Sequence, residues 1–358
     1  MKILLVSPSL RCGGSERVVS LLSQELSNNH PVYLALFNSR EIAYPYSAQL
    51  IDLNFPAQKN LFGKLPIFIK RIFRLIQLIN KIQPDLIISF MESANFPTIC
   101  AAFFCGILSK TKISIHSNPK FFPIYQKLGI FLAYRFPQRV IAVSRGIADE
   151  LKSYYLPLSK ITTIPNPLSL EQVAKLQEQE PQIAKSLPSK FILGVGRLHY
   201  AKGFDRLITA FSRLEDLSLD LVILGSGDEF DHLTKLAQNL GVAERTHFYG
   251  NVENPFPFYR KAFCLVSSSR YEGFSMVILE AFACGCPVIS FDCDFGPSEL
   301  IQNGINGILV KEGDIEELTN SIRLLIQNPL LRETFITNGY EIAKQYDIRS
   351  IAHQYLEN

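Results

Sequence analysis

Short runs rich in valine, isoleucine and leucine alternate along this chain with segments of helical apolar spacing, such as residues 15–28. This alternation constrains the fold more than any other feature, because strands separated by helices form parallel sheets covered on both faces. The sequence therefore predicts an α/β protein. The expected strands lie at 2–7, 31–37, 85–90, 112–116, 139–144 and 161–166, and then at 191–196, 219–225, 246–251, 263–269, 287–292 and 307–310.

A polar stretch separates the two series of strands. Residues 169–190 contain two prolines and no strand-like run, and 358 residues suit two domains of ordinary size. We expect Rossmann-like domains at 1–168 and 190–340, a linker at 169–189, and a C-terminal helix at 341–358 that packs back on the first domain. If the two sheets face each other, the loops at their carboxyl ends surround one central cleft, where ligands of such sheets bind.

Composition and charge exclude several classes of protein. Hydrophobic residues make up 47% of the chain and charged residues 19%, which excludes intrinsic disorder, and a net charge of +3 is too small for a general nucleic-acid binder. The seven cysteines show no repeated C-x-x-C pairs, so we expect a reducing cytoplasm rather than a zinc site or disulfide framework. Residues 1–10 look like a first strand, not a secretion signal, and apolar stretches such as 98–108 are too short to span a membrane.

Paired glycines follow the first expected strand. Gly13 and Gly14 precede Ser15, a good N-cap, and then an amphipathic helix. Backbone N–H groups at such a helix start bind anions, and the helix dipole favours a phosphate there. A tight turn explains the pair equally well, since neither G-x-G-x-x-G nor the Walker pattern is present.

Two cations follow the first strand of the second series. Arg197 comes directly after residues 191–196, and Lys202 lies five positions further on, just before a helix. They can converge above the carboxyl edge of the sheet and hold a diphosphate through charge-assisted hydrogen bonds. A solvated surface pair is the alternative.

The segment 269–290 places two carboxylates eight positions apart. Glu272 lies in a loop after an expected strand, and Glu280 lies inside an apolar helix that begins near Ser275. The acids then reach into one cleft at different depths, towards a sugar ring and a ribose diol, while the N–H groups of 273–277 face phosphates between them. For Glu280 the alternative is a buried acid that is bonded to the backbone for structural reasons.

Together these motifs show a family resemblance. The glycine pair at 13–14, the GRL motif before Lys202 and the E-x7-E acids resemble the retaining glycosyltransferases of family 4, which have the GT-B fold. The likeness covers nearly the whole chain and implies two Rossmann-like, doubly wound domains facing a central cleft. It extends to IPNP at 164–167, GSGDE at 225–229, GPSEL at 296–300 and NGINGILV at 303–310.

The resemblance implies a retaining transferase with a nucleotide-diphosphate sugar as donor, a UDP-sugar being favoured and UDP-HexNAc included. Arg197 and Lys202 match the family's pair on the diphosphate, and Glu280 matches the acid on the ribose. Glu272 matches the catalytic acid beside the donor sugar. The other donor contacts implied are Gly13, Gly14, Val252, Gly273, Phe274, Ser275, Met276 and Val277, with Glu299 on the donor sugar.

Two further positions keep alternative roles. His116, at the end of an expected strand, matches the family's catalytic histidine near the sugar and the acceptor, but a structural hydrogen bond explains it equally well. Asn166 stands between two prolines where the family has a proline, asparagine, glycine turn, so its role stays open.

We expect no metal ion and no cofactor. Arg197, Lys202, a helix N-terminus and the glycine amides at 13–14 supply the positive charge that a diphosphate leaving group requires. The D-x-D motif of Asp292 and Asp294 follows the E-x7-E helix, and the domain order differs from the fold in which D-x-D holds manganese.

Basic and aromatic segments suggest a lipid-linked saccharide as acceptor. A helix at 64–82 can lie on the inner leaflet of a membrane, or its apolar face can cover the sheet while its charges are solvated. Residues 119–139 mix aromatics with Lys and Arg, which suits an acceptor site, a membrane contact or core packing. In the helix, the basic arc is Lys64, Lys70, Arg71, Arg74 and Lys81, and the apolar face is Phe68, Ile69, Ile72, Phe73, Leu75, Ile76 and Ile79.

Two other functions compete with the transferase. A nicotinamide-dependent oxidoreductase has paired Rossmann-like domains as well, but the first strand lacks G-x-G-x-x-G and a ribose-binding acid about twenty residues on. A non-catalytic nucleotide-sugar binding protein needs no catalytic carboxylate, so the presence of both Glu272 and Glu280 counts against it.

Overall fold

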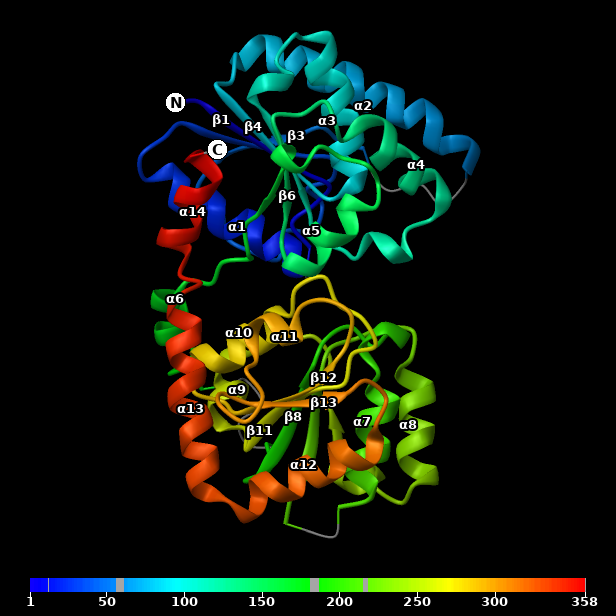
Figure 1. Ribbon diagram of the computed structural model, residues 1–358, viewed down its shortest axis with the longest axis vertical. Coiled ribbons are helices and arrows are strands. Elements are labelled where there is room, and N and C mark those ends of the chain that lie inside the picture. Colours follow the sequence, from blue (N-terminus) through cyan, green and yellow to red (C-terminus); the bar gives the residue numbers. More distant parts are fainter. Residues whose placement is uncertain (12, 56–60, 181–186, 215–217, 358) are drawn as a thin grey trace. The chain divides into compact units, whose positions relative to one another are not determined.

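The computed structural model describes residues 1–11, 13–55, 61–180, 187–214 and 218–357 and divides them into two compact units (Figure 1). Unit 1 contains Met1–Pro167 and the C-terminal helix α14 (Ile348–Glu357), and unit 2 contains Leu168–Asp347.

Helices lie in both the range expected for the linker and the range expected for the C-terminal helix. The range 169–189 begins with helix α6 (Leu170–Leu176), which belongs to unit 2, and 181–186 lies outside the described residues. The range 341–358 contains the end of α13 (Pro329–Lys344) and then α14.

Unit 1 has a sheet of seven parallel strands in the order β3-β2-β1-β4-β5-β6-β7. All five residues of β1, β4 and β5 are buried, as expected for central strands with both faces covered. The strands are β1 (Ile3–Ser7), β2 (Val32–Leu36), β3 (Gln49–Asp52), β4 (Leu86–Phe90), β5 (Thr111–Ile115), β6 (Arg139–Ala142) and β7 (Ile161–Thr163).

Helices cover both faces of this sheet. Ile3 and Leu5 of β1 pack with residues of α1 and α14, whereas Leu4 and Val6 pack with residues of α2 and α3. The helices are α1 (Gly14–Ser27), α2 (Leu61–Ile82), α3 (Glu92–Phe104), α4 (Ile124–Ala133) and α5 (Arg145–Lys152), with short 3-10 turns η1 (Leu108–Lys110), η2 (Pro119–Phe121) and η3 (Leu158–Lys160).

Helix α2 differs from the expected two-faced helix. Leu75 and Ile79 are buried in the core, but Ile69 and Phe73, which we placed on the same apolar face, are exposed. Arg71 is not on a solvated arc, because its guanidinium lies 4.3 Å from the centre of the Phe37 ring. The side chain of Lys64 lies outside the described part of the chain.

Unit 2 has a sheet of six parallel strands in the order β10-β9-β8-β11-β12-β13. From β8 the chain adds β9 and β10 on one side and then returns to add β11, β12 and β13 on the other. The strand order therefore reverses between β8 and β11, where open α/β sheets bind ligands. The strands are β8 (Phe191–Val195), β9 (Asp220–Leu224), β10 (Thr246–Phe248), β11 (Cys264–Ser267), β12 (Val288–Asp292) and β13 (Ile308–Lys311).

The helices of unit 2 also lie on both sides of its sheet (Figure 1). Ile192, Ile223 and Ile289 of the sheet form one buried core with Leu207 of α7 and Leu318 of α12. Besides α6 and α13, the helices are α7 (Phe204–Ser212), α8 (Phe230–Asn239), α9 (Phe256–Lys261), α10 (Met276–Ala283), α11 (Pro297–Leu300) and α12 (Ile315–Gln327), with 3-10 turns η5 (Tyr200–Lys202) and η6 (Ala243–Arg245).

The two parallel-sheet, Rossmann-like domains predicted from the sequence are confirmed. Among the described residues, no helix combines the length and the apolar character that crossing a bilayer requires.

Candidate functional site

A cation and a carboxylate meet in unit 2 where the strand order reverses. The Nζ atom of Lys202, in the loop after β8, lies 2.6 Å from Oε1 of Glu272, in the loop after β11. The Ser269 hydroxyl donates to the same oxygen at 2.7 Å. The side chains of Lys202 and Glu272 are 25% and 10% exposed, so the pair is partly shielded from solvent but still accessible to a ligand. The structure thus brings together two residues that the sequence separates by 70 positions.

Close backbone contacts hold these two loops against each other. Gly203 has a φ of +63°, and a Cβ there would lie 2.1 Å from the carbonyl oxygen of Ser268, so no larger residue fits without a shift. The Ser268 hydroxyl donates to the Lys202 carbonyl at 3.0 Å, and the Arg270 N–H donates to the Ala201 carbonyl at 2.8 Å. The glycine after Lys202 is therefore required by the packing of the site.

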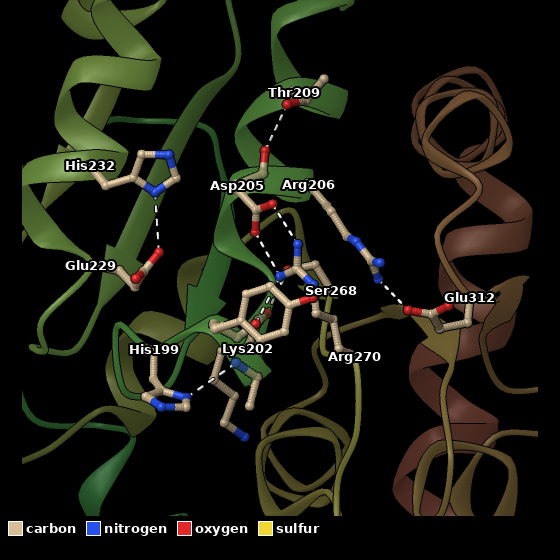
Figure 2. Close-up of polar contacts among 12 residues, drawn as sticks. His199, Lys202, Asp205, Arg206, Thr209, Glu229, His232, Ser268, Arg270 and Glu312 are labelled. Carbon is tan, nitrogen blue, oxygen red and sulfur yellow. Dashed lines mark hydrogen bonds and ion pairs between the residues drawn. The ribbon is translucent and has the colours of Figure 1, made fainter.

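A second ion pair supports the same loops (Figure 2). The guanidinium of Arg270 donates to both carboxylate oxygens of Asp205, at 2.8 and 2.6 Å, and stacks 4.0 Å from the centre of the Tyr200 ring. Partial burial opposes ionisation of Asp205, but the hydrogen bonds and charge of Arg270 outweigh it and lower the pKa of this carboxyl group. Sequence reasoning did not single out this pair; both residues flank predicted site motifs, which was the available signal.

Arg197 lies exposed on the loop after β8. The GSGDE motif packs against this loop: the N–H of Leu198 donates to the Ser226 carbonyl, and a Cβ at Gly225 would lie 1.9 Å from the Gly196 carbonyl oxygen. Within the described residues the Arg197 side chain has no hydrogen-bond or ion-pair partner. A free cation therefore stands near the start of the segment that ends in Lys202.

Helix α10 begins at Met276, after Ser275, as the sequence predicted. The Ser275 hydroxyl is buried and has no hydrogen-bond partner among the described residues. Glu280, one turn further, is also buried, and its Oε2 accepts a hydrogen bond of 2.9 Å from the Tyr259 hydroxyl. Glu280 is thus a buried acid, as the alternative expected, but this partner is a side-chain hydroxyl rather than the backbone.

The remaining donor positions of unit 2 lie in the loops and helix starts at the carboxyl ends of the strands. Val252 is half-buried after β10, next to the loop whose Gly250 carbonyl accepts from the Gly225 N–H at 2.7 Å. Glu299 is half-buried in the short helix α11. Gly273 and Val277 are half-buried, whereas Phe274 and Met276 are buried.

The D-x-D motif holds the loop of Glu272 through the backbone. The carbonyl of Asp294 accepts from the Glu272 N–H at 3.2 Å, while both aspartates are exposed. Over the ranges that the structure describes, no three or more His, Cys, Asp or Glu side chains are grouped so as to hold a metal ion.

In unit 1, the glycine pair starts α1 at Gly14, so the N-cap is Gly13 and not Ser15. The Gly13 N–H donates to the Tyr44 hydroxyl at 3.3 Å. The Glu16 carboxylate lies beside this turn and accepts from the Ser15 hydroxyl at 2.7 Å. The N-terminus of α1 thus lies beside Glu16, an acid of the first turn of the same helix.

His116 follows β5, and its Nε2 lies 2.9 Å from the Ser114 hydroxyl. Its Nδ1 is buried and has no hydrogen-bond partner among the described residues. Burial lowers the pKa of this imidazole to about 3, so His116 is neutral at physiological pH. A neutral ring with one unpartnered nitrogen can accept or donate one further hydrogen bond.

A buried acid of unit 1 escaped sequence reasoning. Glu92 begins α3 directly after β4, and burial raises its pKa to about 7. Its Oε1 has no hydrogen-bond partner within the described ranges. Asn95, one turn further, donates to the Ser114 carbonyl at 3.0 Å. The only signal in the sequence was the position of Glu92 just after a predicted strand.

Comparisons with known proteins identify the class and then the family. The chain has 23% identity and a TM-score of 0.83 to Anabaena HepE in complex with UDP and glucose, covering 100% of this chain and 98% of HepE. For the lipopolysaccharide outer core galactosyltransferase WaaB the values are 22% and 0.73, over 99% and 98% of the two chains. These likenesses define a GT-B fold.

Sequence models of two families match the chain. The model described as Glycosyltransferase Family 4 matches residues 12–172, and the one described as Glycosyl transferases group 1 matches residues 176–342. The chain therefore belongs to the family 4 glycosyltransferases, as its motifs predicted, and it is a glycosyltransferase enzyme.

Two relatives from Campylobacter jejuni align along the whole chain. One, "N-acetylgalactosamine-N,N'-diacetylbacillosaminyl-diphospho-undecaprenol 4-alpha-N-acetylgalactosaminyltransferase", is 28% identical, covering 98% of this chain and 96% of the relative. The other, "GalNAc-alpha-(1->4)-GalNAc-alpha-(1->3)-diNAcBac-PP-undecaprenol alpha-1,4-N-acetyl-D-galactosaminyltransferase", is 25% identical over 100% and 98% of the two chains.

Proposed function

We propose that this enzyme transfers a sugar, with retention of anomeric configuration, from a UDP-sugar to a lipid-linked saccharide in the biosynthesis of a surface polysaccharide or glycan. UDP-HexNAc is the preferred donor in this proposal. It is supported by the two Campylobacter relatives, whose names give an N-acetylgalactosaminyl group and undecaprenol-linked saccharides. Anabaena HepE, which shares the fold, was crystallised with UDP-glucose.

One observation carries the donor assignment. It is the Lys202–Glu272 pair at the carboxyl edge where the strand order reverses, with Arg197, which is unpaired within the described residues, on the same loop as Lys202. A Lys ammonium has three donors, so Lys202 can bind Glu272 and a phosphate oxygen at once. Arg197 supplies a second cation with a planar fork that suits phosphate. The two cations stabilise the negative charge that develops on a diphosphate leaving group.

Glu272 is the carboxylate beside the donor sugar in this proposal. Its contacts with Lys202 and Ser269 fix it in one orientation, so the carboxylate faces the anomeric carbon as positive charge develops there. Glu280 contacts the ribose, the N–H groups of 273–277 face the phosphates, and Val252 and Glu299 complete the donor contacts.

Unit 1 supplies the acceptor side. The neutral His116 provides a hydrogen bond at the sugar or the acceptor hydroxyl through Nδ1, which has no partner in the described part of the chain. Gly13 and Gly14 approach the donor phosphates. No metal ion or cofactor is required, since the chain's own cations supply the charge. We further propose a cytoplasmic enzyme whose helix α2 presents Lys70, Arg74 and Lys81 to an anionic membrane surface.

Calorimetric titration with UDP tests the donor site. We expect Arg197→Gln and Lys202→Gln each to weaken UDP binding by about 10- to 100-fold, the value of one charge-assisted hydrogen bond. Lys235→Gln, which removes an exposed cation from α8, is the matched control and should bind UDP as the unaltered enzyme does. Equal UDP affinity in all four proteins would refute the diphosphate assignment.

Turnover separates the transferase from its competitors. Incubation with UDP-GlcNAc or UDP-GalNAc and a polyprenyl-diphosphate saccharide should release UDP and extend the saccharide, and NMR of the product should show the anomeric configuration of the donor. Binding of NADH without binding of UDP would support the oxidoreductase. UDP-sugar binding with neither transfer nor hydrolysis would support a non-catalytic binding protein.

A further inference from the structure

Unit 1 exposes a row of large apolar side chains along helix α4, which lies beside α3 (Figure 1). Ile124, Leu128 and Leu132 recur every four residues, so they lie on one face of the helix. Their exposed fractions are 80%, 56% and 54%. Exposed aromatic rings adjoin this row: Phe121, Tyr125, Phe131 and Phe136. Core packing, one of the readings that the sequence left open, does not explain these side chains.

The opposite face of α4 fixes the helix in place. Ile130 is fully buried, and a Cβ at Gly129 would lie 2.6 Å from the Phe96 ring of α3, so the backbone of α4 lies directly on that ring. Tyr134, just after α4, is also fully buried, with its ring centre 5.3 Å from that of Phe96. The exposed row is therefore held outward by tight packing on the inner side.

The charged side chains within residues 119–139, which contain the exposed row, all have one sign. Residues 119–139 contain Lys120, Lys127, Arg135 and Arg139 and no aspartate or glutamate. The guanidinium of Arg135 lies 5.0 Å from the centre of the exposed Phe131 ring. Lys127 reaches back to donate to the Lys120 carbonyl at 2.7 Å. Cations among exposed aromatic and aliphatic groups complement an anionic, partly apolar surface.

We propose that α4 and its flanking residues 121–136 form a docking surface for an anionic lipid bilayer. The apolar row enters the boundary between headgroups and acyl chains, and the aromatic rings lie at headgroup level, where such rings are favoured. The cations bind lipid phosphates, each contributing to affinity at an anionic surface. This surface is distinct from the basic positions of α2 and does not depend on the proposed donor site.

A single tryptophan tests the insertion directly, because the chain contains none. The Leu128→Trp variant should show a blue-shifted emission on adding vesicles of equimolar phosphatidylcholine and phosphatidylglycerol, and lipids brominated on the acyl chain should quench it. Leu330→Trp, at a position of unit 2 that is 79% exposed, is the control and should show neither effect. Equal responses of the two variants, or no response of Leu128→Trp, would overturn the proposal.

Co-sedimentation with the same vesicles measures the two components of binding. Changing Ile124, Leu128 and Leu132 together to serine should reduce binding at least about tenfold, since three apolar side chains no longer leave water. Changing Lys120 and Arg135 together to glutamine should reduce binding to the anionic vesicles by about 30-fold. Vesicles of pure phosphatidylcholine should bind the unaltered enzyme as weakly as the anionic vesicles bind this double variant. Circular dichroism melting and UDP titration check that each variant is folded.

Two outcomes would assign the surface to another occupant and refute the proposal that it docks on a bilayer. The first is a stable dimer in lipid-free sedimentation velocity that the triple serine variant dissociates, combined with no vesicle binding. The second is binding only to vesicles that contain a polyprenyl phosphate, which would make the surface a site for the lipid carrier. Neither readout requires a sugar donor, so failure here leaves the proposed transferase activity standing.

Discussion

At the scale of single residues, the Lys202–Glu272 contact is the most informative feature of the molecule. Without a donor, the ammonium of Lys202 is bound to a carboxylate whose negative charge repels an incoming phosphate. Removing the charge of Glu272 therefore has opposite effects on donor binding and on reaction.

We predict that Glu272→Gln binds UDP roughly two- to tenfold more tightly, because a negative charge near the phosphates is removed, and that its transfer rate falls by at least about 100-fold. Calorimetry gives the first quantity and a coupled UDP-release assay the second. A variant with an unchanged transfer rate would show that Glu272 has no role beside the donor sugar.

His116 should stay uncharged across the physiological range. With its pKa lowered by burial to about 3, its NMR signals should not titrate between pH 5 and 8. The imidazole of the unfolded chain takes up a proton near pH 6.5, whereas that of the folded chain does so only near pH 3. The contribution of His116 to the free energy of unfolding is therefore complete above pH 6.5 and is lost as pH falls towards 3. An NMR midpoint near 6.5 would contradict the burial of this ring; His116→Asn assigns the signal.

Glu92 should destabilise unit 1 at alkaline pH. Burial raises its pKa from 4.5 to about 7, so ionised Glu92 is less favourable in the folded chain than in the unfolded chain. The resulting loss of unfolding free energy is absent below pH 4.5 and complete above pH 7. We expect Glu92→Gln to raise the free energy of unfolding by about 2 to 3 kcal/mol at pH 8 and by clearly less at pH 5. Urea unfolding at both pH values measures this, with exposed Glu357→Gln as the control, and an equal effect at both would exclude titration of Glu92 as the cause.

At the scale of elements, the donor loops depend on backbone geometry as much as on side chains. The loops after β8 and β11 touch through Gly203 and the Ser268 carbonyl, and the Asp205–Arg270 pair bridges the start of α7 and the loop after β11. Lys202 is positioned next to Glu272 only if these loops stay in contact.

Substituting Gly203 tests this dependence. Gly203→Ala must bear a left-handed backbone and a clash with Ser268, so we expect a loss of about 2 to 4 kcal/mol in unfolding free energy and weaker UDP binding. Gly241 has a similar φ of +70° and open space around it, so Gly241→Ala should lose only about 1 kcal/mol and bind UDP normally. Equal losses in urea unfolding would mean that the contact with Ser268 is unimportant.

At the scale of the whole molecule, the chain leaves unit 1, forms unit 2 and returns to complete unit 1. The two crossing points lie side by side, since the Leu168 N–H donates to the Tyr346 carbonyl at 2.9 Å. Helix α14 then packs on α1, and the buried ammonium of Lys112 in β5 donates to the Tyr355 carbonyl at 2.9 Å. The last residues of the chain thus form part of the core of the first unit.

Weakening α14 should therefore destabilise the N-terminal unit specifically. Ile351→Ala removes buried apolar volume from the core shared with α1 and β1, which costs about 2 to 4 kcal/mol. Hydrogen exchange should report faster opening in unit 1, while UDP binding changes little. Exposed Leu330→Ala should alter neither, and faster exchange confined to unit 2 would contradict the placement of α14.

Much of the architecture could be predicted from the sequence, because period and order are local properties of the chain. The central strands are runs of buried residues bounded by turn residues, and the family motifs follow them at fixed spacing. The missed strand was β3 (Gln49–Asp52), a four-residue edge strand whose residues are all exposed or half-buried, so it lacks an apolar run.

The two α/β units, the family and the loops in which Lys202 and Glu272 lie all follow from the amino-acid sequence alone. The pairing of polar groups is visible only in the folded chain. Examples are the ion pair between those loops, the Tyr259 partner of Glu280, and Oε1 of Glu92, which has no partner among the residues that the structure describes. The tertiary structure also decided that the apolar row of α4 faces outward. The physical reason is that periodicity depends on neighbours along the chain, whereas burial and pairing depend on contacts between segments far apart in it.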